Sequence, residues 1–289
     1  MIPFEQELEL YHYCESLCSQ KARIGFVEKQ LDYKSHHIVI CDVAEECQNL
    51  DDDYLKVNPK GIVPTLVHHG QPVYDAHQII RHIDLEYPDS GTRLWPTDTR
   101  ELKIADFWFD EGMLKDDQPL GTNFGTSIAF LSRPLLARML QRQSLELVIE
   151  KYKRHPIEQR RKGFVALRKG VQAPREVEER ALSILINALR VVNDQLAQSG
   201  GPWVLDEFSV VDITMMACFH RLEDIHLDDL LAHKTLPELS GYWERLQNRP
   251  SYQSAIVAWH DEENWRSAIK DLYGDKKSPI LDDAVSLLI

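Results

Sequence analysis

The chain has 289 residues, which is enough for two domains with a substantial core. Hydrophobic residues make up 43% of it and charged residues 27%, which is ordinary for a soluble globular protein. The net charge of −13 argues against binding to nucleic acid, whose phosphates need clustered Lys and Arg, and against binding to an anionic membrane surface.

Residues 6–90 have the pattern of a small α/β domain. Its expected elements are, in chain order, a strand at 9–13, a helix at 19–29, a strand at 36–40, a loop with a short helical turn at 43–55, a hairpin of strands at 64–68 and 72–74 around a Gly70-Gln71 turn, and a helix at 77–86. Ile38, Val39 and Ile40 are apolar enough for their strand to lie within a sheet. This order of elements predicts a thioredoxin-like domain, βαβ plus ββα, with a mixed sheet.

A linker at 88–97 follows, because Pro88 stops the preceding helix and Gly91 permits a turn. From residue 98 to 273 we expect an all-α domain, and then a C-terminal tail at 274–289. Apolar residues at helical spacing predict helices at 128–142, 145–152, 176–196, 209–222 and 236–247. Ser209 and Asp212 have the spacing of a capping box, which is a folding signal rather than a chemical one. The basic run at 151–162 is expected to be a solvated insertion.

The cysteines and the first residues indicate the compartment. The five cysteines have neither metal-site spacing nor a Cys-x-x-Cys redox pair: Cys14, Cys18, Cys41, Cys47 and Cys218. No signal peptide or transmembrane stretch of about 20 apolar residues is visible. We therefore expect a reducing, cytoplasmic compartment and no bound metal.

Ser16, Cys18 and Ser19 lie where the first strand gives way to the first helix. A helix N-terminus offers free N–H groups and the positive end of the peptide dipole, which stabilise anions and lower the pKa of thiols. The pattern therefore predicts a site for a thiolate, either bound or intrinsic. The alternative is that Ser16 simply caps the helix.

Four motifs in this order and spacing resemble the glutathione S-transferase family: Ser16–Arg23, Asn58–Pro64, Asp75–Ile80 and Phe208–Ile213. The resemblance covers residues 8 to 260 and is greatest to the zeta class, to tetrachlorohydroquinone dehalogenase-like members and to differentiation-associated-protein-like members. It implies the glutathione transferase fold, glutathione as co-substrate and a homodimer. It also implies activation of the glutathione thiol for attack on a hydrophobic electrophile, by conjugation, reductive dehalogenation, aryl-ether cleavage or isomerisation.

The resemblance assigns two catalytic candidates. In the family the first Ser of the motif donates a hydrogen bond to the glutathione sulfur, which is the role implied for Ser16. In the dehalogenase-like members a Cys of the motif forms a mixed disulfide with glutathione, which is the role implied for Cys18. The alternative for Cys18 is a small buried apolar residue.

The residues implied to bind glutathione are Ser19, Lys60, Val63, Pro64, Asp75 and Ala76. A cis Val63-Pro64 bond would present the Val63 backbone to the cysteinyl part, and Asp75 would pair with the γ-glutamyl amine. Lys60 is either a partner of the glycyl carboxylate or a solvated side chain. Ala76 keeps a backbone N–H for the γ-glutamyl carboxylate but lacks the usual Ser hydroxyl. That departure favours the alternative function, a catalytically weak glutathione-transferase-like binding or scaffold protein.

Two expectations concern the pocket for the second substrate. A set of aromatic residues should be partly core and partly wall of this pocket: Phe107, Trp108, Phe109, Phe124 and Phe130. Residues 250–273 should cover its mouth, with Trp259 or Trp265 nearby. The apolar end of the tail should dock on the body of the protein, because exposed it would promote aggregation.

Overall fold

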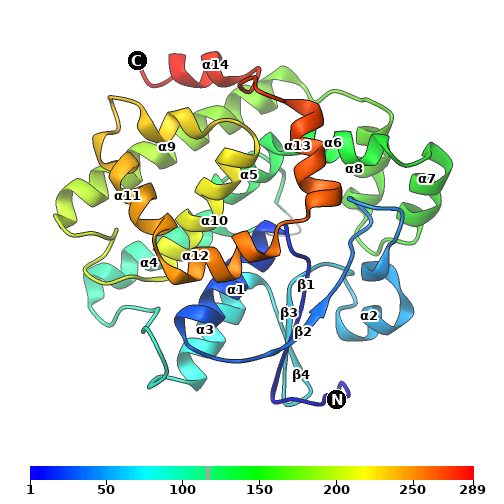
Figure 1. The fold of residues 1–289 in the computed structure, drawn as a ribbon, viewed down its shortest axis with the longest axis horizontal. Helices are drawn as coiled ribbons and strands as arrows, with labels where there is room; N and C mark the ends of the chain where they lie inside the picture. The colour runs from blue at the N-terminus through cyan, green and yellow to red at the C-terminus, as the bar shows by residue number, and fades with distance from the viewer. Residues whose placement is uncertain (115–117) are drawn as a thin grey trace.

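The computed structural model describes residues 1–114 and 118–289 (Figure 1). The N terminus and a small sheet lie at one end, and helices fill the rest of the molecule up to the C terminus. The strands are β1 (Leu8–His12), β2 (Lys34–His37), β3 (Thr65–His68) and β4 (Gln71–Tyr74). Their order is β2-β1-β3-β4; β1 and β2 are parallel, and β3 is antiparallel to both β1 and β4. The predicted mixed sheet is therefore confirmed.

Alternation along the strands supplies both faces of this sheet. Leu66 of β3 packs with Phe26 and Ile79, which belong to α1 (Leu17–Glu28) and α3 (Ala76–Glu86). The next residue, Val67, packs on the other face with Tyr54 of α2 (Asp52–Val57), which follows a 3₁₀ turn at Gln48–Leu50.

Two local predictions for this domain are wrong. The strand expected at 36–40 ends at His37, because Val39 and Ile40 pack with Tyr13 and Cys14 instead of with strand neighbours. The strand also lies at the edge of the sheet and not within it. The hairpin turn is His69-Gly70 and not Gly70-Gln71, because His68 pairs with Gln71. His69 and Gly70 have φ angles of 48° and 76°, as a two-residue type I′ turn requires.

The helical part surrounds α10, whose residues are buried on nearly every side. The predicted capping box begins α10. The Asp212 side chain accepts from the Ser209 N–H, and the Ser209 side chain accepts from a backbone N–H of the first turn. The helices of this part are α4 (Thr99–Gly112), α5 (Phe124–Leu131), α6 (Arg133–Gln141), α7 (Leu145–Lys153), α8 (Glu158–Arg168), α9 (Arg175–Ser199), α10 (Val210–Asp224), α11 (Pro237–Gln247), α12 (Pro250–Ala255), α13 (Ser267–Leu272) and α14 (Leu281–Ser286).

The helix expected at 128–142 is interrupted. Ser132 ends α5 and also precedes α6, and Pro134 lies in the first turn of α6. Proline has no N–H and its ring clashes with the preceding turn, so it is tolerated at a helix start but not inside one continuous helix. The prediction overlooked this break.

Helix α1 contacts both parts of the chain through two fully buried cations. Lys21 Nζ donates to the Gly112 carbonyl of α4 at 2.8 Å. Arg23 donates to the Cys14 carbonyl at 2.6 Å and to the Ala255 carbonyl of α12 at 2.8 Å. These bonds attach the β1–α1 loop to the helical part.

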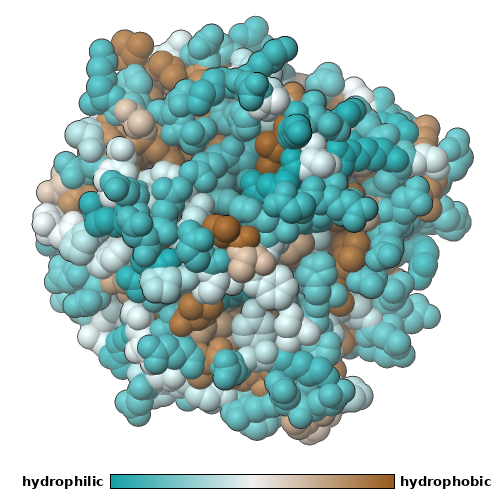
Figure 2. All heavy atoms as spheres, in the orientation of Figure 1, coloured by the Kyte–Doolittle hydropathy of each residue, from teal (hydrophilic) through white to brown (hydrophobic). Residues whose placement is uncertain are grey.

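The tail docks as predicted. Ala284 and Leu288 are buried in the main core, and Arg190 of α9 donates to the Leu287 carbonyl at 2.6 Å. The face in Figure 2 is largely hydrophilic, with small separate hydrophobic patches. None of the helices that the structure describes combines the length and the apolar character needed to cross a membrane.

Candidate active site

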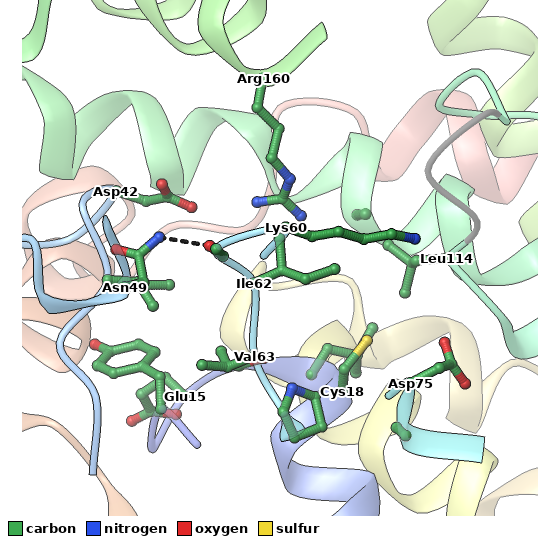
Figure 3. A pocket seen from close by; sticks show the side chains of 18 of the residues that line it. Glu15, Cys18, Asp42, Asn49, Lys60, Ile62, Val63, Asp75, Leu114 and Arg160 are labelled. Atoms are coloured by element: carbon green, nitrogen blue, oxygen red, sulfur yellow. Dashed lines mark hydrogen bonds between the residues drawn. The ribbon is translucent and has the colours of Figure 1, made fainter. Parts of the chain in front are cut away.

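A pocket of about 590 Å³ lies where the β1–α1 loop, the loop before β3 and the start of α3 face the helical part (Figure 3). It brings together nearly all the residues that the sequence singled out. Those that line it are Ser16, Cys18, Lys60, Val63, Pro64, Asp75 and Ala76. Ser19 does not line it: its side chain is fully buried, and its hydroxyl accepts a hydrogen bond from the Tyr13 N–H at 3.3 Å.

Ser16 is the N-cap of α1. Its Oγ accepts from the Ser19 N–H at 3.3 Å, which leaves the hydroxyl hydrogen for a second bond. Among the described residues, no acceptor bonds to the N–H groups of Leu17 and Cys18. The helix start therefore presents these donors, with the positive end of the helix dipole, beside the pocket.

Cys18 is a half-buried thiol on the first turn of α1. Burial raises its pKa to about 11, although the Lys21 ammonium acts in the opposite direction. The sequence pattern suggested a lowered pKa, but loss of hydration outweighs the nearby positive charge. At neutral pH Cys18 is therefore a thiol, and an anion stabilised by this helix start belongs to a ligand.

The loop before β3 presents unpaired backbone to the pocket. The Val63-Pro64 bond is cis, as the resemblance implied. No described residue bonds to the N–H or the carbonyl of Val63. Asn49 Nδ2 donates to the Gly61 carbonyl at 2.8 Å and Asn58 Nδ2 to the Ile62 carbonyl at 2.8 Å, which fixes the loop from behind. An extended peptide therefore fits here as an added strand.

Asp75 and Ala76 begin α3. Asp75 Oδ1 accepts from the His77 N–H at 2.9 Å and from the Gln78 N–H at 3.4 Å, so this carboxylate caps the helix. The N–H of Ala76 has no acceptor among the described residues, and it faces the same pocket. Burial lowers the pKa of His77 well below its usual range, so His77 adds no charge to this subsite.

The opposite wall contains polar residues that the sequence reasoning missed. Asp42 and Asn49 line it, together with Arg160 of α8. The Tyr152 hydroxyl of α7 donates to the Asp42 carboxylate, and burial raises the pKa of Asp42. The basic run at 151–162 was thus wrongly predicted to be a solvated insertion, since Arg160 lines the pocket and Lys151 is buried.

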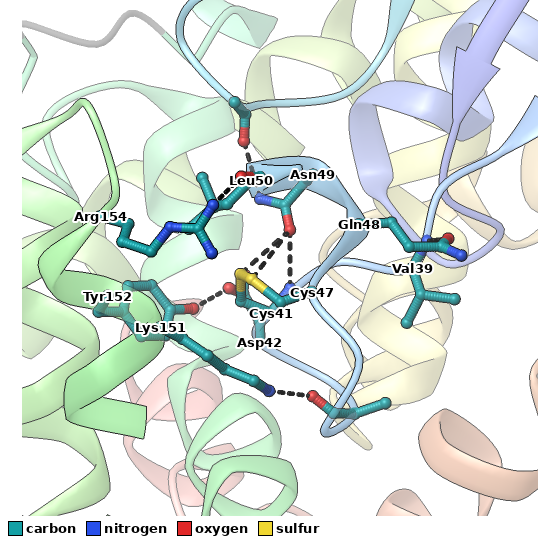
Figure 4. The surroundings of a disulfide bond; sticks show 12 residues. Val39, Cys41, Asp42, Cys47, Gln48, Asn49, Leu50, Lys151, Tyr152 and Arg154 are labelled. Atoms are coloured by element: carbon teal, nitrogen blue, oxygen red, sulfur yellow. Dashed lines mark hydrogen bonds between the residues drawn. A yellow bond between two sulfur atoms is a disulfide. The ribbon is translucent and has the colours of Figure 1, made fainter. Parts of the chain in front are cut away.

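A disulfide between Cys41 and Cys47 closes the loop that holds this wall (Figure 4). Asn49 Oδ1 accepts from the Cys41 N–H at 2.9 Å, and Lys151 Nζ donates to the Ala44 carbonyl at 2.6 Å. The bond differs from the free thiols expected of a reducing compartment. A six-residue separation with no motif around it gave no signal in the sequence.

The apolar side of the pocket comes from the helical part. Its members are Met113, Leu114, Ala129, Leu136 and Trp265. None of the five aromatic residues expected in this wall lines the pocket; Trp108, Phe124 and Phe130 are buried in the core instead. Trp265 of the segment 250–273 lines the pocket, as predicted. Trp259 does not: the Arg23 guanidinium lies over it, 5.1 Å from the centre of the Trp259 ring.

A buried charge cluster supports the loop that precedes Ser16. Arg221 donates to the Glu15 carbonyl at 2.5 Å and to Asp224 at 3.1 Å. Glu15 accepts from the Asp261 N–H at 2.9 Å, while its second oxygen has no partner among the described residues. Burial and the Asp224 carboxylate raise the pKa of Glu15 above its usual range.

Metal-ligand geometry occurs twice in the described residues. Glu15, His220 and Asp224 have ligand atoms within 4.8 Å of one another, as do Glu7, His68 and His69. Arg266 fills the first group, bonding to Asp224 at 2.7 Å and to His220 at 3.0 Å. The second group lies at the hairpin, where the Tyr87 hydroxyl already donates to Glu7 at 2.5 Å.

Comparisons with known proteins match this arrangement along nearly the whole chain. The family models for the N-terminal and the C-terminal domain of glutathione S-transferases match residues 15–86 and 164–259. A tetrachloro-p-hydroquinone reductive dehalogenase from Sphingobium chlorophenolicum is 26% identical over 265 residues, which cover 91% of this chain and 99% of that protein. Glutathione S-transferase TCHQD from Arabidopsis thaliana is 23% identical over 273 residues, or 90% of this chain and 92% of that protein.

The crystal structure of the β-etherase LigF from Sphingobium sp. strain SYK-6 superimposes with a TM-score of 0.73 at 20% identity, covering 86% of this chain and 98% of that one. That likeness establishes the shared fold. Since both domain models match in the order in which the chain forms its sheet and its helices, the chain belongs to the glutathione S-transferase family.

Proposed function

We propose that this protein is a glutathione S-transferase that activates the glutathione thiol for attack on a hydrophobic electrophile. One observation supports this most directly. The Val63 backbone and the N–H groups at the start of α1, to which no described residue bonds, line one pocket together with Ser16. A glutathione-bound theta-class transferase from Xanthomonas axonopodis is among the structures with this fold.

In this proposal, different residues of the chain bind glutathione and stabilise its sulfur. Glutathione supplies the thiol that becomes the nucleophile. The Val63 backbone pairs with the cysteinyl part, and the Ala76 N–H donates a hydrogen bond to the γ-glutamyl carboxylate at the start of α3. The Ser16 hydroxyl and the N–H groups of Leu17 and Cys18 stabilise the sulfur as an anion, which increases the fraction of reactive thiolate at neutral pH.

The second substrate is proposed to bind against the apolar wall that includes Leu114, Leu136 and Trp265. Relatives named as a reductive dehalogenase and a β-etherase favour an aromatic electrophile with a leaving group. In a dehalogenation, Cys18 would lose its proton and attack the glutathionyl sulfur of the aryl conjugate. The sulfur–aryl bond would break, the aryl carbon would take up a proton, and the Cys18–glutathione mixed disulfide would remain for a second glutathione to reduce. The raised pKa of Cys18 opposes the deprotonation that this step needs.

The domain limits and the assembly are also proposals. We propose a glutathione-binding domain at 6–90, a substrate domain at 98–273 and a tail at 274–289. We further propose a cytoplasmic homodimer, and a monomer mass by light scattering at micromolar concentration would contradict the dimer.

The function is tested with the purified full chain. Calorimetry measures glutathione binding, and mass spectrometry measures glutathione adducts of 1-chloro-2,4-dinitrobenzene, a chlorinated hydroquinone and a β-aryl ether. Turnover of any of them supports the transferase. Glutathione binding without turnover indicates the alternative, a binding or scaffold protein, for which Ala76 in place of Ser is the favouring feature. Absence of both contradicts the glutathione site.

A further inference from the structure

Arg160 differs from the other basic residues around it. It projects from α8 toward the pocket, on the side of Asp42 and Lys60 (Figure 3). Its guanidinium lies 5.9 Å from the centre of the Phe164 ring, and no described residue forms a hydrogen bond or an ion pair with it.

Three basic residues near Arg160 in the chain each have a partner among the described residues. Lys151 donates to the Ala44 carbonyl at 2.6 Å, and Arg161 donates to the His155 carbonyl at 3.2 Å. Lys162, on the same helix but exposed, pairs with Glu158 at 2.5 Å. A guanidinium has five donors and suits a planar carboxylate.

The acidic group of this wall, Asp42, is close enough for the charge of Arg160 to oppose the rise in its pKa that burial causes, but the two side chains do not bond. Asp42 is bonded to the Tyr152 hydroxyl and makes no ion pair with Arg160, although the two side chains line the same pocket. Its loop is closed by the Cys41–Cys47 disulfide, so Asp42 is held in place. The wall therefore keeps an available positive group facing the cavity.

We propose that Arg160 binds a carboxylate of a ligand in this pocket, an inference that rests on the proposed glutathione transferase function. Two ligands of this pocket are possible sources of the carboxylate. In Figure 3, Asp75 and Asp42 lie on opposite sides of Val63, and Arg160 points into the pocket between Asp42 and Lys60. An extended glutathione with its γ-glutamyl end at the start of α3 and its cysteinyl part at Val63 would therefore direct its glycyl carboxylate toward the Asp42 side. The second source is an acidic group on the electrophile.

The experiment compares Arg160→Met with Lys162→Met, which removes the same charge from the exposed side of α8. Calorimetry measures binding of glutathione and of γ-glutamylcysteine, which lacks the glycine. Kinetics use 1-chloro-2,4-dinitrobenzene and its acidic counterpart 4-chloro-3-nitrobenzoate. Loss of a charged hydrogen bond at this partly exposed site should weaken binding about tenfold, and Arg160→Lys should restore part of it.

Each outcome has a defined meaning. Weaker binding of glutathione but not of γ-glutamylcysteine identifies the glycyl carboxylate as the partner. A raised KM for 4-chloro-3-nitrobenzoate alone identifies an acidic electrophile. If the wild type is active and Arg160→Met matches Lys162→Met in every assay, the inference about Arg160 is overturned while the transferase function stands. If the wild type binds neither glutathione nor the acidic electrophile, both proposals fail.

Discussion

Replacing Ser16 with alanine removes two hydrogen bonds with different consequences. The first is the cap bond from the Ser19 N–H at 3.3 Å, whose loss should lower the free energy of unfolding by about 1 kcal/mol. The second is the proposed bond from the hydroxyl to the glutathione thiolate, whose loss would cost about 1.5–3 kcal/mol. The second loss should lower kcat/KM about tenfold to a hundredfold.

The same loss should appear in the pH profile. Weaker stabilisation of the anion raises the pKa of the bound thiol by about one to two units, since one unit corresponds to about 1.36 kcal/mol. The rate with glutathione and 1-chloro-2,4-dinitrobenzene should therefore reach its half-maximum at correspondingly higher pH in Ser16→Ala.

Ser144→Ala is the matched control. Ser144 caps α7 and accepts from the Leu147 N–H at 3.1 Å, but it does not line the pocket. It should lose similar stability and retain the wild-type rate and pH profile. If Ser16→Ala and Ser144→Ala have equal rates and equal pH midpoints, Ser16 has no part in stabilising the thiolate.

Three further predictions concern the thiol, a buried ion pair and the tail. Cys18 should react with iodoacetamide slowly at pH 7 and with a midpoint near pH 11, because burial raises its pKa to about 11; a midpoint below about 8.5, the value of a free thiol, would contradict this. Asp84→Ala should lower the free energy of unfolding in urea by about 3–5 kcal/mol, because it leaves the buried Lys29 ammonium, now 3.0 Å from Asp84, without its partner. The exposed Asp89→Ala is its control, and equal urea midpoints would show that the pair is not required. Deleting 275–289 should lower the melting temperature, since each buried leucine of the tail contributes about 1.5–3 kcal/mol; an unchanged melting curve would refute the docked tail.

The sequence allowed the architecture and one side of the pocket to be predicted, because both depend on local patterns. The Ser16 cap and the start of α3 follow from adjacent residues, whereas the cis Val63-Pro64 bond was implied by the family resemblance. The edge position of β2 was not predictable, since Ile38–Ile40 are only partly buried, and they pack against clusters that include residues distant in sequence, such as Tyr13 and Val67.

The far wall of the pocket was missed for a similar reason. Asp42 and Arg160 are 118 positions apart and meet only because α7 and α8 fold back over the loop after β2. Within a basic run, nothing distinguishes the side chains that turn inward, Lys151 and Arg160, from those that face water. Likewise the raised pKa of Cys18 follows from burial, which helix position alone does not reveal.

The contacts of helix α1 with the helical part limit how such proteins can be divided into separate domains. Lys21 and Arg23 are among the signature residues of the chain, yet they bond to carbonyls of Gly112, Cys14 and Ala255 and do not line the pocket. Expressed alone, the first domain would expose the face of α1 that contacts α10 and α12 and would lose the anchor of the loop holding Ser16. The N-terminal α/β part therefore does not separate cleanly from the rest of the chain. An exchange between relatives would have to transfer α1 together with the helices that contact it.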